Sequence, residues 1–119
     1  MDTKLEFTLM KKDEPLVEVV YDYKTQTLTT DYITKDPYDS LVLGYYRPTE
    51  LEDIQAWIET RCFPRSRVDA EFLLKELGLS TYHPLSIVKI THGHTPEDFY
   101  WIRFSGETLT WDEINLFKT

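Results

Sequence analysis

The spacing of apolar residues changes along the chain at residues 49–58, TELEDIQAWI. Four apolar side chains in this stretch recur at helical spacing, and these are Leu51, Ile54, Trp57 and Ile58. Such spacing places one apolar stripe along a helix and turns it toward a core. Thr49 and Glu52 have the form of a capping box, in which the two residues satisfy each other's backbone N–H groups. The stretch therefore predicts a helix that starts at Thr49 and that Pro64 ends.

Upstream of Thr49, apolar and polar residues alternate, which is the pattern of half-buried β-strands. The alternation covers two runs, Leu5, Phe7 and Leu9 in the first and Val17, Val19, Tyr21 and Tyr23 in the second. Polar residues 11–14 separate the runs and favour an antiparallel hairpin. The threonine-rich run 28–33 predicts a third strand, and residues 35–46, which have no clear period, predict a loop. We therefore expect an α+β fold with a small antiparallel sheet of three strands, followed by three or more short helices.

Downstream of Pro64, helix signals continue. Ser66 with Asp69 can cap a second helix, and Gly78 suits the left-handed residue just past its end. Pro84 is typical of a first helical position, so a third helix is expected from there to the neighbourhood of His92.

Residues 95–98 (TPED) form another helix start signal, but residues 99–104 are aromatic and β-branched and fit either a strand or a helix. Thr110 and Glu113 repeat the capping-box form ahead of a last short helix. We expect a single domain over residues 1–119. In it residues 1–48 hold the strands and the loop, and residues 49–119 hold the helical part, with residues 99–104 as a candidate additional strand.

Composition and charge narrow the classes of function. The chain has 119 residues and a net charge of −8. Residues 1–60 carry 13 acidic and 6 basic side chains, so most of the negative charge lies in the first half. Proteins that bind nucleic acid carry a basic face, so direct DNA or RNA binding is not expected. One cysteine, Cys62, rules out an intrachain disulfide, and the N-terminus has no secretory pattern, so a cytoplasmic location is expected.

Residues 51–104 resemble a short module that precedes HipA-like kinase domains and also occurs as small stand-alone proteins of bacterial mobile elements. The resemblance rests on residues 57–67 (WIETRCFPRSR), 77–79 (LGL), 91–93 (THG) and 98–102 (DFYWI), with 109–115 (LTWDEIN) as the continuation. It implies a regulatory or docking unit without catalytic activity. The four glycines are isolated and form no phosphate-binding loop, so phosphoryl transfer by this chain is not expected.

The loop at residues 38–47 is the candidate site for contact with a partner protein. Tyrosine and arginine are enriched at interface hot spots, and loops without their own period often carry binding groups. The candidate residues are Tyr38, Tyr45, Tyr46 and Arg47, joined by Arg61 and Arg65 on either side of Pro64. The structural alternatives are that the loop aromatics fold onto the core and that the arginines around Pro64 pair internally. The arginines Arg61, Arg65 and Arg67 would then pair with acids such as Glu59 or Asp69, or with the acidic N-terminal half.

The leading hypothesis is thus a non-catalytic protein-binding or regulatory module of a phage or other mobile element, acting on a host or cognate protein. The alternative is an anti-CRISPR or other anti-defence inhibitor that imitates nucleic-acid charge with an acidic surface formed by Asp31, Asp36 and Asp39. A small enzyme of unknown reaction is the third hypothesis, although no catalytic arrangement can be defended.

Metal and cofactor sites are not expected. His92 and His94 could share a metal with Glu97 or Asp98, but that spacing is a weak signal. We expect His92 instead to cap the preceding helix. The thiol of Cys62 lies between arginines that could lower its pKa, although a small buried side chain is the simpler interpretation.

Overall fold

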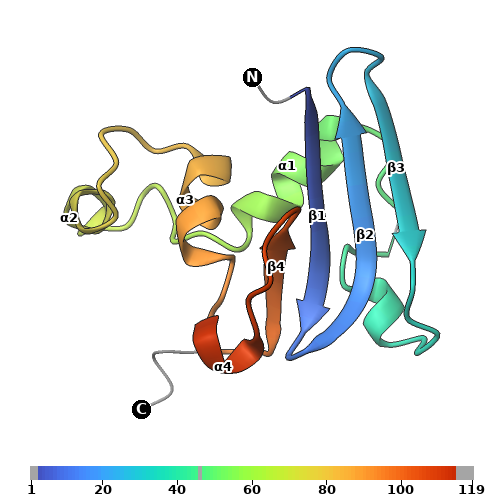
Figure 1. Ribbon diagram of the computed structural model, residues 1–119. Coiled ribbons are helices and arrows are strands. Elements are labelled where there is room, and N and C mark those ends of the chain that lie inside the picture. The colour runs from blue at the N-terminus through green and yellow to red at the C-terminus, as the bar shows by residue number, and fades with distance from the viewer. Residues whose placement is uncertain (1–2, 46, 115–119) are drawn as a thin grey trace.

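The computed structural model describes residues 3–45 and 47–114 and has the expected α+β architecture (Figure 1). Its described part contains a sheet of four antiparallel strands in the order β3-β2-β1-β4. The strands are β1 (Lys4–Lys11), β2 (Glu14–Asp22), β3 (Thr27–Tyr32) and β4 (Tyr100–Phe104). The first three are the predicted strands, and the fourth corrects the predicted number.

The run at 99–104, which periodicity left open, is a strand because it pairs with β1. Thr8 lies opposite Arg103, and Leu9 lies opposite Ile102. The helix start signal at 95–98 precedes no helix, so that prediction was wrong. The carboxylate of Asp98 instead accepts hydrogen bonds from the backbone N–H of Tyr100 and from the guanidinium of Arg61.

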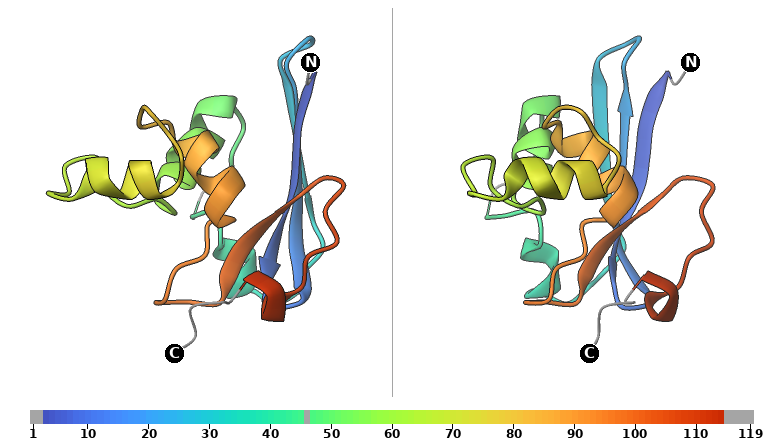
Figure 2. Two further views of the ribbon diagram at one scale, coloured as in Figure 1. Left: turned by 60° about the vertical axis from the view of Figure 1, so that its left-hand side comes forward. Right: turned by 90° about the vertical axis from the view of Figure 1, so that its left-hand side faces the viewer.

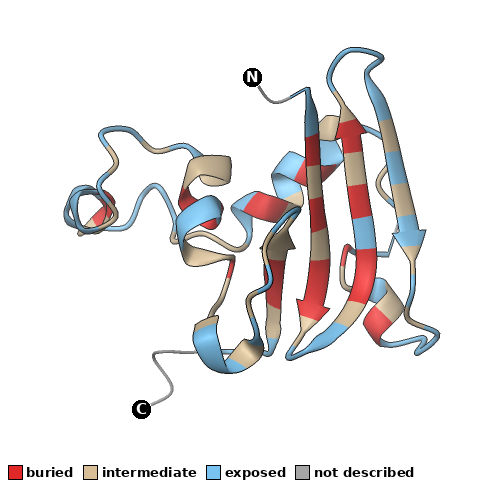
Figure 3. Cartoon of the chain, in the orientation of Figure 1, coloured by how far each residue is buried: buried red, intermediate tan, exposed pale blue. Residues whose placement is uncertain are grey.

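The helices are α1 (Leu51–Glu59), α2 (Ala70–Glu76), α3 (Pro84–Thr91) and α4 (Trp111–Ile114), with a 3-10 turn η1 at Asp39–Leu41. In both views of Figure 2, α1, α2 and α3 lie to one side of the sheet. The α2 helix extends away from the sheet, and of its side chains only Ala70 and Leu74 are buried (Figure 3). None of the helices in the described residues is long and apolar enough to cross a membrane.

The core lies between the sheet and helices α1 and α3. Ile54 and Ile58 of α1 and Val88 of α3 are buried against Leu9 and Ile102 of the strands. Full burial of such a side chain stabilises the fold by about 1.5–3 kcal/mol. The apolar stripe of residues 51–58 therefore holds α1 against the sheet and leaves its opposite side free.

The C-terminal ends of α2 and α3 follow the predicted signals, whereas the starts of α1 and α2 differ from them. Gly78 has a φ of 77° just beyond α2, as expected, and His92 ends α3 with a φ of 59°. The capping box of α1 lies one residue later than predicted, because Glu50 and Asp53 form it rather than Thr49 and Glu52. At Asp69 no side-chain cap is formed.

Candidate functional site

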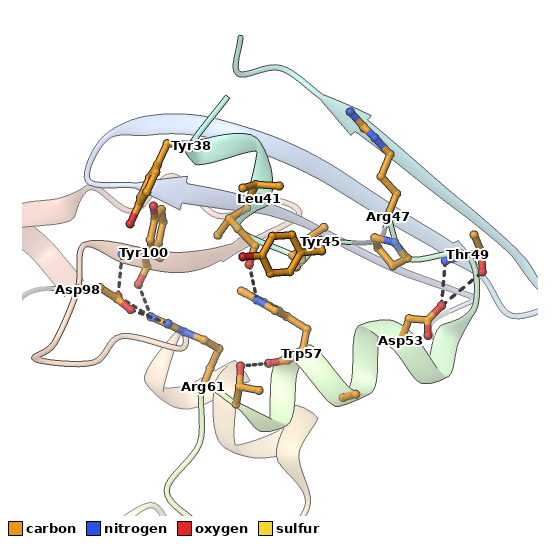
Figure 4. A pocket seen from close by; sticks show the side chains of 16 residues that line it. Tyr38, Leu41, Tyr45, Arg47, Thr49, Asp53, Trp57, Arg61, Asp98 and Tyr100 are labelled. Atoms are coloured by element: carbon orange, nitrogen blue, oxygen red, sulfur yellow. Dashed lines mark hydrogen bonds and ion pairs between the residues drawn. The ribbon is translucent and has the colours of Figure 1, made fainter. Parts of the chain in front are cut away.

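An open groove of about 1180 Å³ lies between the loop at residues 38–49, helix α1 and the start of β4 (Figure 4). We call it the aromatic groove after four of its lining side chains, Tyr38, Tyr45, Trp57 and Tyr100. The remaining lining residues are Leu41, Val42, Leu43, Gly44, Arg47, Pro48, Thr49, Asp53, Ala56, Thr60, Arg61 and Asp98.

One side of α1 forms a wall of the aromatic groove. Asp53, Ala56, Trp57 and Thr60 are spaced three to four residues apart and so share a helix face. Ala56 and Thr60 have small side chains, which leaves the space beside Trp57 open. The indole Nε1 of Trp57 donates a hydrogen bond of 2.9 Å to the carbonyl of Val42. Trp57 therefore both lines the groove and fixes the loop opposite it.

The wall nearest β4 is held by a buried carboxylate. Asp39 is only 4% exposed. It accepts a hydrogen bond of 3.0 Å from the hydroxyl of Tyr100 and pairs with the ammonium of Lys11 at 3.3 Å. Burial, together with the hydrogen bond to Asp39, raises the pKa of Tyr100 to about 12. Tyr100 is therefore a neutral hydrogen-bond donor over the whole physiological range.

Arg61 joins α1 to the segment that precedes β4. Its Nη1 lies 2.9 Å from Oδ2 of Asp98, and its Nη2 lies 2.8 Å from Oδ1. The same guanidinium donates to the carbonyls of Gly93 and Tyr100, each at 2.9 Å. Burial by itself would raise the pKa of Asp98, but hydrogen bonds from Arg61 and from the Tyr100 backbone outweigh it and lower the pKa. This end of the groove is therefore rigid and electrically balanced.

Four of the predicted contact residues, Tyr38, Tyr45, Arg47 and Arg61, meet in the aromatic groove. Tyr38 is 80% exposed and Tyr45 is 90% exposed, so neither folds back onto the core. The guanidinium of Arg47 lies 3.7 Å from the centre of the Tyr32 ring. Tyr46 lies outside the described residues.

Arg65 is separate from this groove. Its guanidinium lies 4.7 Å from the centre of the Tyr82 ring, and it lines a smaller hollow with His83. The arginines around Pro64 therefore do not form one site, because Arg61 lines the aromatic groove and Arg65 lines the smaller hollow. Arg67 pairs with Asp69, one of the acids expected for internal pairing. Arg61 also has an internal acid partner, but that partner is Asp98.

The acidic surface of the alternative hypothesis needs a correction. Asp31 and Asp36 are exposed, but Asp39 is buried. The carboxylate of Asp36 accepts hydrogen bonds from the backbone N–H groups of Tyr38 and Asp39, which shapes the turn ahead of η1. Asp39 therefore supports the groove from within and does not face a partner.

The histidines and the cysteine have structural partners. His92 lies at the end of α3, as expected, and its Nε2 is 2.9 Å from Oε2 of Glu107. His94 packs against the ring of Trp111. Burial and the nearby charge of Glu59 raise the pKa of Cys62 to about 11, opposite to the lowering that its arginine neighbours suggested. Across the described ranges, no group of three or more His, Cys, Asp or Glu side chains could hold a metal ion.

Asp98 and Tyr100 are among the lining residues that sequence reasoning missed as parts of the site. Their partners Arg61 and Asp39 are 37 and 61 residues away in the sequence, so no local pattern indicates them. Ala56 and Thr60 could have been found, because they lie on the side of the predicted helix that faces away from its apolar stripe.

Comparisons with known proteins find no match among protein-family models, curated proteins or solved structures.

Proposed function

We propose that this chain is a non-catalytic protein-binding or regulatory module that contacts its partner through the aromatic groove. The observation that carries the proposal is the exposure of Tyr38 and Tyr45, 80% and 90%, at the edge of a groove of about 1180 Å³. Tyrosine supplies a large contact area at little cost in conformational entropy, because it has few rotatable bonds. Such side chains beside a hollow fit a contact site better than they fit a core.

The rigidity of the groove supports binding. Trp57 holds the loop through Val42, and Arg61 holds the segment before β4 through Asp98. A wall that is fixed before the partner arrives loses little entropy on binding, which favours affinity. The groove is therefore prepared for a ligand by contacts within the chain.

The ionisable groups of the groove support binding over catalysis. Asp98 in the lining is paired with Arg61, and Asp39, which is buried behind the lining, is paired with Lys11. Burial and the hydrogen bond to Asp39 raise the pKa of Tyr100 to about 12. A general acid or base works best with a pKa near the operating pH and within reach of a substrate. The groups in this groove instead stabilise its walls.

From the resemblance of residues 51–104, the proposal extends to a cytoplasmic module of a phage or other mobile element that acts on a host or cognate protein. The alternative, an anti-CRISPR or other anti-defence inhibitor with an acidic surface, is the weaker proposal, because Asp39 is buried. The two differ in salt dependence. A nucleic-acid mimic releases its basic partner as ionic strength rises, whereas aromatic contacts persist.

Affinity capture from host lysate with matched variants tests the proposal. The bait is the wild-type chain, the double variant Tyr38→Ala/Tyr45→Ala, or the control Tyr23→Ala. Tyr23 is also an exposed tyrosine but lines a different hollow. We expect a protein that is captured by the wild type and the control and lost with the double variant, in moderate and in high salt. Capture that is equal for all three baits would reject the groove as the contact site.

A further inference from the structure

The cation position beside one of the groove's aromatic rings, that of Trp57, is already filled by the chain itself. The guanidinium of Arg61 lies 6.0 Å from the centre of the Trp57 ring and is neutralised by Asp98. The guanidinium of Arg47, the other cation among the described lining residues, stacks on Tyr32, which is not part of the lining. A ligand cation would therefore meet a like charge beside Trp57 and beside Arg47. The lining charges, Arg47 and Arg61 against Asp53 and Asp98, also balance. The interior of the groove therefore suits an uncharged ligand.

The groove is aromatic more than aliphatic. Among its aliphatic lining residues Leu43 is buried and Val42 and Pro48 are half-buried. Leu41 and the small Ala56 are exposed. An amphipathic helix needs a continuous apolar strip that receives side chains at i, i+3, i+4 and i+7. One exposed leucine among tyrosines does not provide such a strip. Flat rings that pack against flat rings fit this surface better.

Hydrogen-bond donors lie at the outer edge of the groove. The Nε1 of Trp57 is used by Val42, and the hydroxyl of Tyr100 is used by Asp39. The hydroxyls of Tyr38 and Tyr45, on strongly exposed side chains, can donate to a ligand. A suitable ligand therefore presents carbonyl oxygens next to apolar rings.

These features lead to one occupant, and the inference rests on the proposed function. We propose that the aromatic groove binds an extended, proline-rich segment of the partner protein in the polyproline II conformation, with basic residues flanking the prolines. Polyproline II has no internal hydrogen bonds, so its carbonyls can accept from tyrosine hydroxyls. Proline rings pack on aromatic faces, and the stiff chain loses little entropy on binding. At about 1180 Å³ the groove exceeds the usual range of small-molecule pockets, roughly 300–1000 Å³, and suits a chain segment.

The charge around the groove selects basic flanks. In residues 38–60, which form most of its walls, four acidic side chains are exposed and one basic side chain is exposed, while the fifth acid, Asp39, is buried. The exposed charged residues are Glu50, Glu52, Asp53, Glu59 and Arg47. Basic residues outside the groove would be attracted to this region and would speed association. Salt screens this attraction, whereas the contacts between prolines and aromatic rings persist at high ionic strength. Single-stranded nucleic acid also stacks on aromatic rings, but a net charge of −8 repels its phosphates. A proline-rich peptide with basic flanks matches both the uncharged, aromatic interior of the groove and the acidic residues around it.

Fluorescence anisotropy with labelled probes tests the inference on the purified full chain. The probes are oligoproline flanked by arginines, oligoalanine flanked by arginines, oligoproline flanked by glutamates, and a single-stranded oligodeoxynucleotide. We expect the first probe to bind best. Its affinity should fall roughly tenfold in Tyr45→Ala and stay unchanged in Tyr23→Ala.

Three results would overturn the inference: equal binding of the oligoalanine probe, preferred binding of the oligonucleotide, or no binding of arginine-flanked oligoproline. The proposed function has a separate outcome. If Tyr38→Ala/Tyr45→Ala abolishes capture of a partner but no proline probe binds, the occupant is wrong and the groove remains the contact site. If the wild type and Tyr38→Ala/Tyr45→Ala capture the partner equally well, the proposed function itself is wrong.

Discussion

Arg61 and Asp98 form a two-point ion pair, with nitrogen–oxygen distances of 2.9 and 2.8 Å, between the residues that follow α1 and those that precede β4. The side chain of Arg61 is 10% exposed, and that of Asp98 is 32% exposed. The pair closes one end of the aromatic groove by connecting segments that are 37 residues apart. A role in holding the groove's shape follows from this geometry.

Removing the arginine should therefore destabilise the fold. In Arg61→Ala, Asp98 loses its partner, and the carbonyls of Gly93 and Tyr100 lose a donor. We expect the free energy of unfolding to fall by roughly 2–4 kcal/mol in urea titrations. Arg61→Lys should recover only part of this loss, because an ammonium cannot reproduce the two-point geometry.

Arg67→Ala is the matched control for Arg61→Ala. Its pair with Asp69 is exposed and should contribute less than about 1 kcal/mol. Equal losses in the two alanine variants would contradict the assigned role.

The same pair predicts how stability depends on pH. The pKa of Asp98 is lowered in the folded state, so the folded protein binds this proton less readily than the unfolded chain. Its stabilisation is then fully present above the unfolded aspartate pKa of about 3.9 and is lost as the pH falls through the lowered folded value. Asp98→Asn should reduce the dependence of stability on pH between neutral and acidic buffers. An unchanged acid profile in Asp98→Asn would show that other carboxylates cause it.

Substitution of Tyr100 should lower the stability of the fold, whereas substitution of Tyr45 should weaken partner binding and leave stability almost unchanged. Tyr100→Phe removes the hydroxyl that donates to buried Asp39 and should cost about 1–3 kcal/mol of stability. Tyr45→Ala and Tyr38→Ala should leave the melting temperature almost unchanged, because both side chains are exposed, and should each weaken partner binding by roughly 1–3 kcal/mol. Thermal melts and binding isotherms on the same samples separate the two effects. A large drop in melting temperature for Tyr45→Ala would place its ring in the core.

Two glycines allow a test of how tightly the groove end is packed. Gly78 and Gly93 both have positive φ, so alanine at either position is strained by about 1–2 kcal/mol. A Cβ at Gly78 would meet open space, whereas one at Gly93 would lie 3.2 Å from Cδ1 of Ile102 and 3.4 Å from Cβ of Arg61. Gly93→Ala should therefore be the more destabilising variant in chemical denaturation. The reverse order would mean that the packing around Arg61 is loose.

Sequence patterns predict the local parts of this structure and miss its long-range pairs. The stripe of residues 51–58 gives α1, and the lack of period at 35–46 points to the loop that carries Tyr38 and Tyr45. The capping box was misplaced by one residue because Thr49/Glu52 and Glu50/Asp53 have the same spacing. The Asp53 carboxylate reaches the N–H groups of both Thr49 and Glu50, and this geometry is invisible in the sequence.

Local sequence patterns could not predict contacts between residues that are far apart in the chain. β4 exists because residues 100–104 add to the free edge of β1, and their own composition fits a helix as well. Asp39 was assigned to a surface since a loop aspartate is normally exposed. Its burial depends on Lys11 and Tyr100, which come from β1 and β4.

Photo-crosslinking from position 45 tests the aromatic groove most directly. A photoreactive phenylalanine analogue replaces Tyr45 in one version of the chain and Tyr23 in another, and both are irradiated in host cells. If the groove is the contact site, position 45 should yield a crosslinked partner, and the crosslinked peptide should include prolines. Position 23 should yield no such partner. A partner crosslinked from position 23 and not from position 45 would contradict a groove-mediated contact.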